Sequence, residues 1–112
     1  MELAFHTKSV RGTCENEDQA KVELGVEVAE ALKHRLADMR AARSPKDLVA
    51  GRPRIVADGQ EMAIDVCEGY RIIFKANHLD CPSNDMGGVD WAKVSRIKIM
   101  RIESEDESRP RI

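Results

Sequence analysis

The chain has 112 residues, of which 42% are hydrophobic and 34% charged, and its formal net charge is −2. This length predicts one domain, and the apolar residues come in helix- and strand-length runs, which argues against disorder. The three cysteines form no CxxC pair, which argues against a disulfide framework and a zinc knuckle. No apolar stretch approaches the ~20 residues of a transmembrane helix, and the N-terminal MELAFHTK lacks an apolar signal-peptide core, so we expect a cytoplasmic protein that enters no membrane.

The first half of the chain predicts one strand and two helices. The strand covers residues 2–6, a short helix covers 8–15, and a long helix runs over 17–42 behind a candidate N-cap at Asn16. Gly25 either interrupts the long helix or divides it in two, and the sequence leaves both readings open. Four apolar residues of the long helix recur at helical spacing and form one buried stripe: Val28, Leu32, Leu36 and Met39.

Residues 61–76 predict a β-hairpin, because two alternating apolar runs flank a turn that contains Gly69. A two-residue loop would mix apolar and charged residues on both faces of the hairpin. A three-residue loop over 67–69, with Gly69 in the left-handed conformation, gathers six apolar residues on one face. We therefore expect the second register, which pairs Val66 with Tyr70, Ile64 with Ile72 and Met62 with Phe74, and sets Asp65 opposite Arg71.

The other predicted elements are a short strand around 54–57, a long polar loop over 77–93 and a last strand over 94–102. Met100 breaks the alternation of the last strand, which indicates a bulge or a strand end. The order of elements predicts an α+β fold, β-α-α-β-β-β, with a small antiparallel sheet covered on one face by helices. We expect the domain to span 1–103, followed by a frayed acidic tail at 104–112.

The uncovered face of the predicted sheet gathers cations, namely Arg71, Lys75, Arg96 and Lys98, with Arg52 or Arg54 near its edge. Cations on a platform of strands suit phosphate binding, and arginine binds phosphate through a planar fork of donors. Cleavage of RNA by its own 2′-hydroxyl also needs a group that accepts a proton and one that donates a proton. Lys75 and Lys98 are candidates for these roles, and His78 is the histidine expected nearest this face.

Other chemistries have less support in the sequence. His78 and Cys81 have the spacing of two metal ligands, but no second pair accompanies them. Gly87-Gly88 is not followed by the Lys-Ser/Thr of a phosphate-binding loop, and no spacing supports a Cys–His nucleophile. We therefore predict neither a metal site nor a cofactor.

Three segments carry a family resemblance: GYRIIF at 69–74, Ser-Pro-x-Asp-Leu at 44–48 and the closing strand VSRIKI at 94–99. In this order and at this length, over about residues 1–103, the chain resembles the RelE/ParE toxin superfamily and its HigB-like branch of plasmid-maintenance killer proteins. The resemblance implies a toxin of a type II toxin–antitoxin system, inhibited by a co-encoded, often helix-turn-helix (HigA-like) antitoxin. It also implies a hydrolase that cuts mRNA in the ribosomal A site without a metal.

By this resemblance Arg71 matches the strand arginine that contacts the scissile phosphate, and Arg52 and Arg54 correspond to basic residues ahead of the second strand. Together with the cations of the uncovered face, the expected site has two parts. The catalytic residues are Arg71, Lys75 and Lys98, and the RNA-binding residues are Arg52, Arg54, Arg96 and His78.

The end of the chain departs from the family pattern. Family toxins tend to be basic, and their closing strand often runs into a Tyr or His that joins in catalysis, whereas here it runs into Arg101-Ile102-Glu103-Ser104-Glu105. Two alternatives without catalysis therefore stay open. One is a ParE-like inhibitor of DNA gyrase, and the other is an inactive relative that serves as an antitoxin-binding module. The sequence also leaves room for a homodimer.

Overall fold

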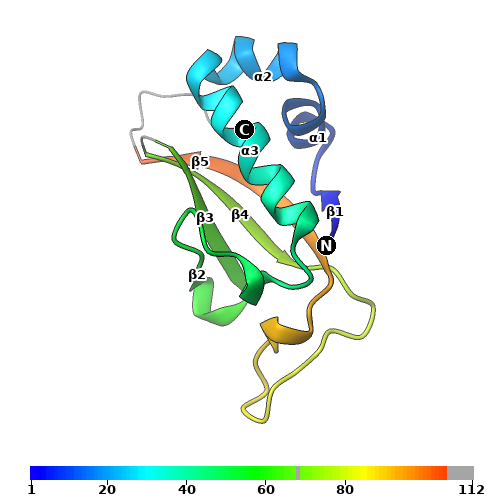
Figure 1. The fold of residues 1–112 in the computed structure, drawn as a ribbon. Helices are drawn as coiled ribbons and strands as arrows, with labels where there is room; N and C mark the ends of the chain where they lie inside the picture. Colours follow the sequence, from blue (N-terminus) through cyan, green and yellow to red (C-terminus); the bar gives the residue numbers. More distant parts are fainter. Residues whose placement is uncertain (68, 106–112) are drawn as a thin grey trace.

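Three helices and a five-stranded mixed sheet make up the computed structural model, which describes residues 1–67 and 69–105 (Figure 1). The sheet order is β1-β5-β4-β3-β2, with β1 parallel to β5 and the other neighbours antiparallel. The helices are α1 (Lys8–Glu15), α2 (Glu17–Leu24) and α3 (Val26–Ala41). The strands are β1 (Glu2–Phe5), β2 (Arg54–Val56), β3 (Glu61–Cys67), β4 (Tyr70–Ala76) and β5 (Arg96–Ser104).

The α+β class is confirmed, and so is the short strand predicted around 54–57, which is β2. Two details of the expected architecture are wrong: four strands rather than three follow the helices, and the sheet is mixed rather than antiparallel. The parallel pair arises because three helices follow β1, so that no hairpin joins β1 to its neighbour β5. Such a long connection allows the last strand to lie beside the first in the same direction.

Gly25 divides the predicted long helix into α2 and α3. Its φ of 90° lies in the left-handed region, which only glycine adopts at no steric cost. The expected cap at Asn16 is confirmed, since its side chain accepts a hydrogen bond from the backbone N–H of Gln19 at 3.0 Å. The apolar stripe of α3 is buried as expected.

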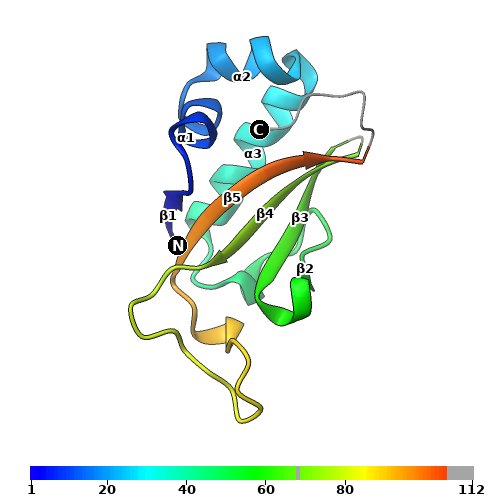
Figure 2. The same ribbon diagram turned by 180° about the vertical axis from the view of Figure 1, so that it is seen from behind.

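All three helices lie on one side of the sheet, and the other side of β3, β4 and β5 is bare of helices (Figures 1 and 2). The α3 stripe packs with alternate residues of β3, β4 and β5 in one apolar core. Phe74 is fully buried there and forms a T-shaped pair with Trp91, with 6.3 Å between the ring centroids. No helix within 1–67 and 69–105 is both long and apolar enough to cross a bilayer.

The hairpin register is confirmed along most of its length. Ile64 pairs with Ile72, Met62 with Phe74, and Asp65 with Arg71, and Gly69 is left-handed with a φ of 82°. The expected pair of Val66 with Tyr70 is wrong. A register shift between Asp65 and Cys67 sets Cys67 opposite Tyr70 instead, so Val66 occupies a bulge.

Strand β5 begins later and ends later than expected. Its partners on β4 step from Arg101 opposite Ile73 to Ile99 opposite Phe74, which leaves Met100 as the bulged residue. This confirms the predicted bulge. The prediction of a frayed tail is wrong for residues 104 and 105. Ser104 is buried and pairs with Tyr70, and the Glu105 N–H donates to the Gly69 carbonyl at 2.8 Å. The rest of the predicted tail, 106–112, lies outside the described residues.

Candidate functional site

The helices leave one side of strands β2–β5 uncovered (Figure 2). The alternation of residues along these strands places charged side chains on that side. Ile72 and Phe74 of β4 belong to the core under the helices, so the alternating residues Arg71, Ile73 and Lys75 lie on the opposite side. We call this side the open face. Its residues are Arg54, Val56, Glu61, Ala63, Asp65, Arg71, Ile73, Lys75, Arg96, Lys98, Arg101 and Glu103.

Two lysines face each other at the end of the open face nearest the long loop. Lys75 of β4 and Lys98 of β5 are direct cross-strand partners, and both are partly exposed. Within the described part of the chain, no carboxylate lies at ion-pair distance from either ammonium group. Arg96, two residues before Lys98, is also exposed, and its Nε lies 3.1 Å from Oε2 of Glu2. Like charges directly opposite each other in a sheet repel, so this lysine pair favours an anion between the two side chains.

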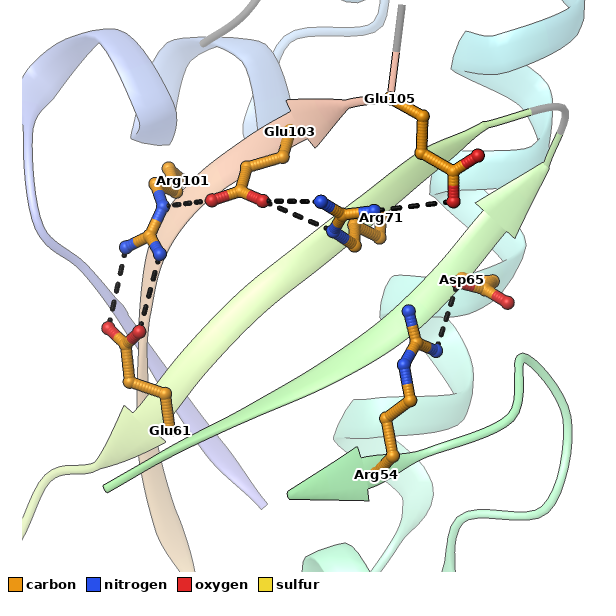
Figure 3. Close-up of polar contacts among 7 residues, drawn as sticks. All are labelled: Arg54, Glu61, Asp65, Arg71, Arg101, Glu103 and Glu105. Atoms are coloured by element: carbon orange, nitrogen blue, oxygen red, sulfur yellow. Dashed lines mark hydrogen bonds and ion pairs between the residues drawn. The ribbon is translucent and has the colours of Figure 1, made fainter. Parts of the chain in front are cut away.

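Arg71, the predicted phosphate contact, lies at the other end of the open face and is engaged by two carboxylates (Figure 3). Its Nη2 and Nε lie 3.0 and 3.1 Å from Oε2 of Glu103, and its Nη1 lies 3.4 Å from Oε1 of Glu105. The Arg71 side chain is 27% exposed. Its guanidinium is therefore on the surface, but the chain itself supplies the counter-charge.

The contacts continue across the sheet as a ladder of alternating charges, Glu61–Arg101–Glu103–Arg71–Glu105 (Figure 3). Arg101 Nε lies 2.5 Å from the second carboxylate oxygen of Glu103, and its Nη2 lies 3.3 Å from Glu61. Burial acts to raise the pKa of Glu103, but hydrogen bonds and charge from Arg101 and Arg71 outweigh it and lower the pKa below its ordinary value. Glu103 therefore stays ionised and holds both arginines at neutral pH.

Asp65 lies opposite Arg71 in the register, but its ion pairs are with other residues. Its two carboxylate oxygens contact Arg52 Nε at 2.6 Å and Arg54 Nη1 at 3.1 Å. Burial acts to raise the pKa of Asp65, and the hydrogen bonds and charges of these two arginines outweigh it and lower the pKa. The expected RNA-binding residues Arg52 and Arg54 are thus paired within the fold.

Gly51 explains why the segment before β2 comes so close to Asp65. Its φ of 87° is left-handed, and a Cβ on it would lie 2.6 Å from the Asp65 carbonyl oxygen. The Asp65 N–H donates to the Gly51 carbonyl, and Arg35 Nε of α3 donates to the Asp65 carbonyl at 3.0 Å. The close approach of Gly51 sets Arg52 and Arg54 against the carboxylate.

The open face is hollowed between β2 and β5. The hollow has a volume of about 330 Å³, with an apolar floor that includes Ala63 and Ile73 and a rim of three arginines and two glutamates: Arg54, Arg71, Arg101, Glu61 and Glu103. A larger hollow of about 400 Å³ lies beside the C-terminal end of α3, and its charged lining residues, Asp38 and Asp47, are both acidic. The hollow of the open face has one more cation than carboxylates in its lining, and so does a further hollow of about 330 Å³ that includes Arg43, Lys93 and Asp47.

His78 has a structural task. Its Nε2 accepts hydrogen bonds from the backbone N–H groups of Ser95 and Arg96 at 3.1 and 3.3 Å, which holds the start of the long loop against the start of β5. These contacts occupy the lone pair of Nε2. The imidazole thus positions Arg96 and the beginning of the strand that carries Lys98.

The expected cations share one face but form separate groups. Lys75, Lys98 and Arg96 lie together, whereas Arg71 is four residues from Lys75 along β4, about 13 Å at ~3.3 Å per residue. Sequence reasoning missed the residues that pair with Arg71, which are Glu103 and Glu105, and the two that extend the ladder, Glu61 and Arg101. For the three that follow Met100 in the chain, the only sequence signal is the break in alternation there, which reverses the facing of later residues. Glu61 falls on the open face by alternation with Asp65.

Within residues 1–67 and 69–105, no three His, Cys, Asp or Glu side chains lie close enough together to hold a metal ion. Comparison with known proteins finds no family model, no curated protein and no solved structure that matches the chain. The resemblance to RelE/ParE toxins therefore rests on the sequence segments that carry it.

Proposed function

We propose that this chain is the toxin of a type II toxin–antitoxin system, and that it binds mRNA on the ribosome through its open face and cuts it without a metal. The observation that carries the proposal is the lysine pair. Lys75 and Lys98 lie opposite each other on an uncovered sheet, with no carboxylate partner among the described residues. A fold gains nothing from placing like charges in this way, whereas a polyanion that lies across both strands relieves their repulsion.

The residues of the open face supply some of the chemistry of RNA cleavage. In this reaction the 2′-oxygen attacks the adjacent phosphorus while the bond from phosphorus to the 5′-oxygen breaks, which leaves a 2′,3′-cyclic phosphate and a 5′-hydroxyl. The lysine pair stabilises the extra negative charge of the pentavalent phosphorus, and Arg71, about 13 Å away along β4, binds a further phosphate of the same strand. Lys75 and Lys98 are the proposed proton-transfer groups: one of them, as a neutral amine, would accept the proton of the 2′-hydroxyl, and the other, as an ammonium group, would give its proton to the departing 5′-oxygen.

Two observations favour a second candidate that needs no catalysis. Arg71 is engaged by two carboxylates, and Nε2 of His78 is occupied by backbone N–H groups. A protein with these features could act by binding alone, as a ParE-like gyrase inhibitor or as an antitoxin-binding module. In either case we propose a helix-turn-helix antitoxin as the partner.

The test is induced expression in bacterial cells, followed by primer extension to map the 5′ ends of mRNA. We expect growth arrest and new mRNA ends with the wild type, and neither with Arg71→Ala or with Lys75→Ala/Lys98→Ala. The matched control is Lys21→Ala/Lys46→Ala, which removes two exposed lysines outside the open face and should behave as the wild type.

Each other outcome points to a specific alternative. Growth arrest with intact mRNA and altered DNA supercoiling would indicate a gyrase inhibitor. A wild-type chain that is not toxic would indicate an inactive relative. Either result would contradict the nuclease proposal.

A further inference from the structure

We propose that Glu105, which directly follows β5, regulates the open face. Glu105 occupies the side of the Arg71 guanidinium that an RNA phosphate would take, so RNA must compete with a carboxylate of the chain itself. This inference rests on the proposed RNA binding and adds to it a built-in competitor.

The two carboxylates on Arg71 differ in how firmly they are held. Glu103 is the register partner of Arg71, its side chain is 24% exposed, and both of its oxygens are engaged, one by Arg71 and one by Arg101. Its depressed pKa keeps it charged. Glu103 is therefore a fixed part of the sheet.

Glu105 is held more weakly. Its side chain is 63% exposed, and Arg71 Nη1 at 3.4 Å is its one ion-pair partner within the described residues. Its backbone is nevertheless fixed, because its N–H donates to the Gly69 carbonyl at 2.8 Å. The hairpin turn thus holds the chain where the carboxylate reaches Arg71, while the side chain itself stays free to swing away.

The Arg71 guanidinium has two edges of N–H donors, and only one of them contacts the firmly held Glu103. Nε and Nη2 meet the same oxygen of Glu103, whereas Nη1 points along the sheet to Glu105 (Figure 3). A phosphate that displaces Glu105 gains Nη1 while Arg71 remains oriented by Glu103. Exposed ion pairs contribute little to stability and weaken with salt, so this exchange is energetically accessible.

The exchange would also set a threshold for binding. A single phosphate gains little from replacing one carboxylate with another anion. A strand of RNA that also lies across Lys75 and Lys98 gains several phosphate contacts at once and outcompetes Glu105. The geometry therefore favours extended polyanions over isolated phosphate groups.

The experiment measures the affinity of a short, fluorescently labelled single-stranded RNA by anisotropy at low salt. Glu105→Gln removes the competing charge with little change of shape, and we expect it to tighten binding by roughly two- to fivefold, the range of an exposed ion pair. The control Glu17→Gln removes an exposed glutamate that pairs with Lys33 on the helical side, and it should leave the affinity unchanged.

Repeating the change in an Arg71→Ala background tests the mechanism. If Glu105 acts by occupying Arg71, then Glu105→Gln gives no gain once Arg71 is gone. An equal gain in both backgrounds would mean a general change of surface charge and would overturn the inference, as would an unchanged affinity with Arg71 present.

The same series separates this inference from the proposed function. RNA that binds the wild type and is weakened by Lys75→Ala/Lys98→Ala, but does not respond to Glu105→Gln, would contradict only the inference. An absence of RNA binding by every variant would overturn both.

Discussion

At the end of the open face near the hairpin turn, the arginines lie against carboxylates. At the end near the long loop, two lysines face each other, and no carboxylate of the described residues lies at ion-pair distance from them. The strands are the same, β4 and β5, and the spacing of their side chains is the same. The difference lies in what each position opposes: Arg71 has Glu103 across from it, and Lys75 has Lys98. Cations that are already paired stabilise the sheet, and unpaired cations are available to a ligand.

The largest effect on stability is expected at Gly51, whose close backbone contact with Asp65 holds Arg52 and Arg54 against the Asp65 carboxylate. Gly51→Ala adds a Cβ at 2.6 Å from the Asp65 carbonyl oxygen on a left-handed backbone, so we expect a loss of about 2 kcal/mol or more in the free energy of unfolding. Denaturant unfolding measures it. Gly59→Ala is the matched control, because its φ of 88° is similar but nothing lies within 4 Å of the added Cβ. Equal losses in the two variants would show that the close approach at Asp65 contributes nothing.

A smaller effect, dependent on pH, is expected at Asp65 itself. Its folded-state pKa lies below the ordinary value of 3.8, so its contribution to stability is present above that value and is lost as the pH falls through the folded pKa. At pH 7 we expect Asp65→Asn to lower the free energy of unfolding by about 1 kcal/mol. The gap between variant and wild type should close in acid, in unfolding curves recorded from neutral pH downward.

The control for this experiment is Asp58→Asn, at an exposed residue with a left-handed φ of 56° that asparagine tolerates. It should stay within about 0.5 kcal/mol of the wild type at every pH. A gap between Asp65→Asn and wild type that persists unchanged in acid would mean that shape, rather than charge, accounts for the effect.

The smallest effect is expected at the lysine pair, and it has the opposite sign. Lys98→Gln removes a like-charge repulsion, so we expect stabilisation by roughly 0.2–1 kcal/mol at low salt, which shrinks as salt is added. Arg71→Gln, on the same two strands, removes an attraction and should destabilise. Thermal unfolding at low and high salt compares the two variants. Shifts of the melting temperature in the same direction would contradict the distinction between the paired arginine and the unpaired lysines.

The hairpin could be predicted from the sequence because its information is local. Alternating apolar residues on either side of Gly69 leave one register that buries a whole face, and the pairs of Ile64 with Ile72 and Met62 with Phe74 follow from it. The apolar stripe of α3 follows from its spacing in the same way. The bulge at Val66 has no such local signal, because the pattern reads equally well without it.

The partners of Arg71 were missed because they depend on pairing between distant segments. With unbroken alternation from Ile97 and Ile99, Arg101 and Glu103 would point under the helices. The extra residue Met100 reverses this order, so that Ile102 enters the core and its charged neighbours lie on the open face. The sequence shows the break, but only the pairing with β4 shows that the strand continues beyond it.

The salt dependence of RNA affinity tests the central claim most directly. For single strands, the logarithm of the binding constant falls with the logarithm of the salt concentration by about 0.7 per phosphate contact. If Lys75 and Lys98 each contact a phosphate, Lys75→Ala/Lys98→Ala should make this slope shallower by about 1.4, and Lys21→Ala/Lys46→Ala should leave it unchanged. An equal slope for the wild type and the Lys75→Ala/Lys98→Ala variant would show that the open face does not bind the RNA backbone.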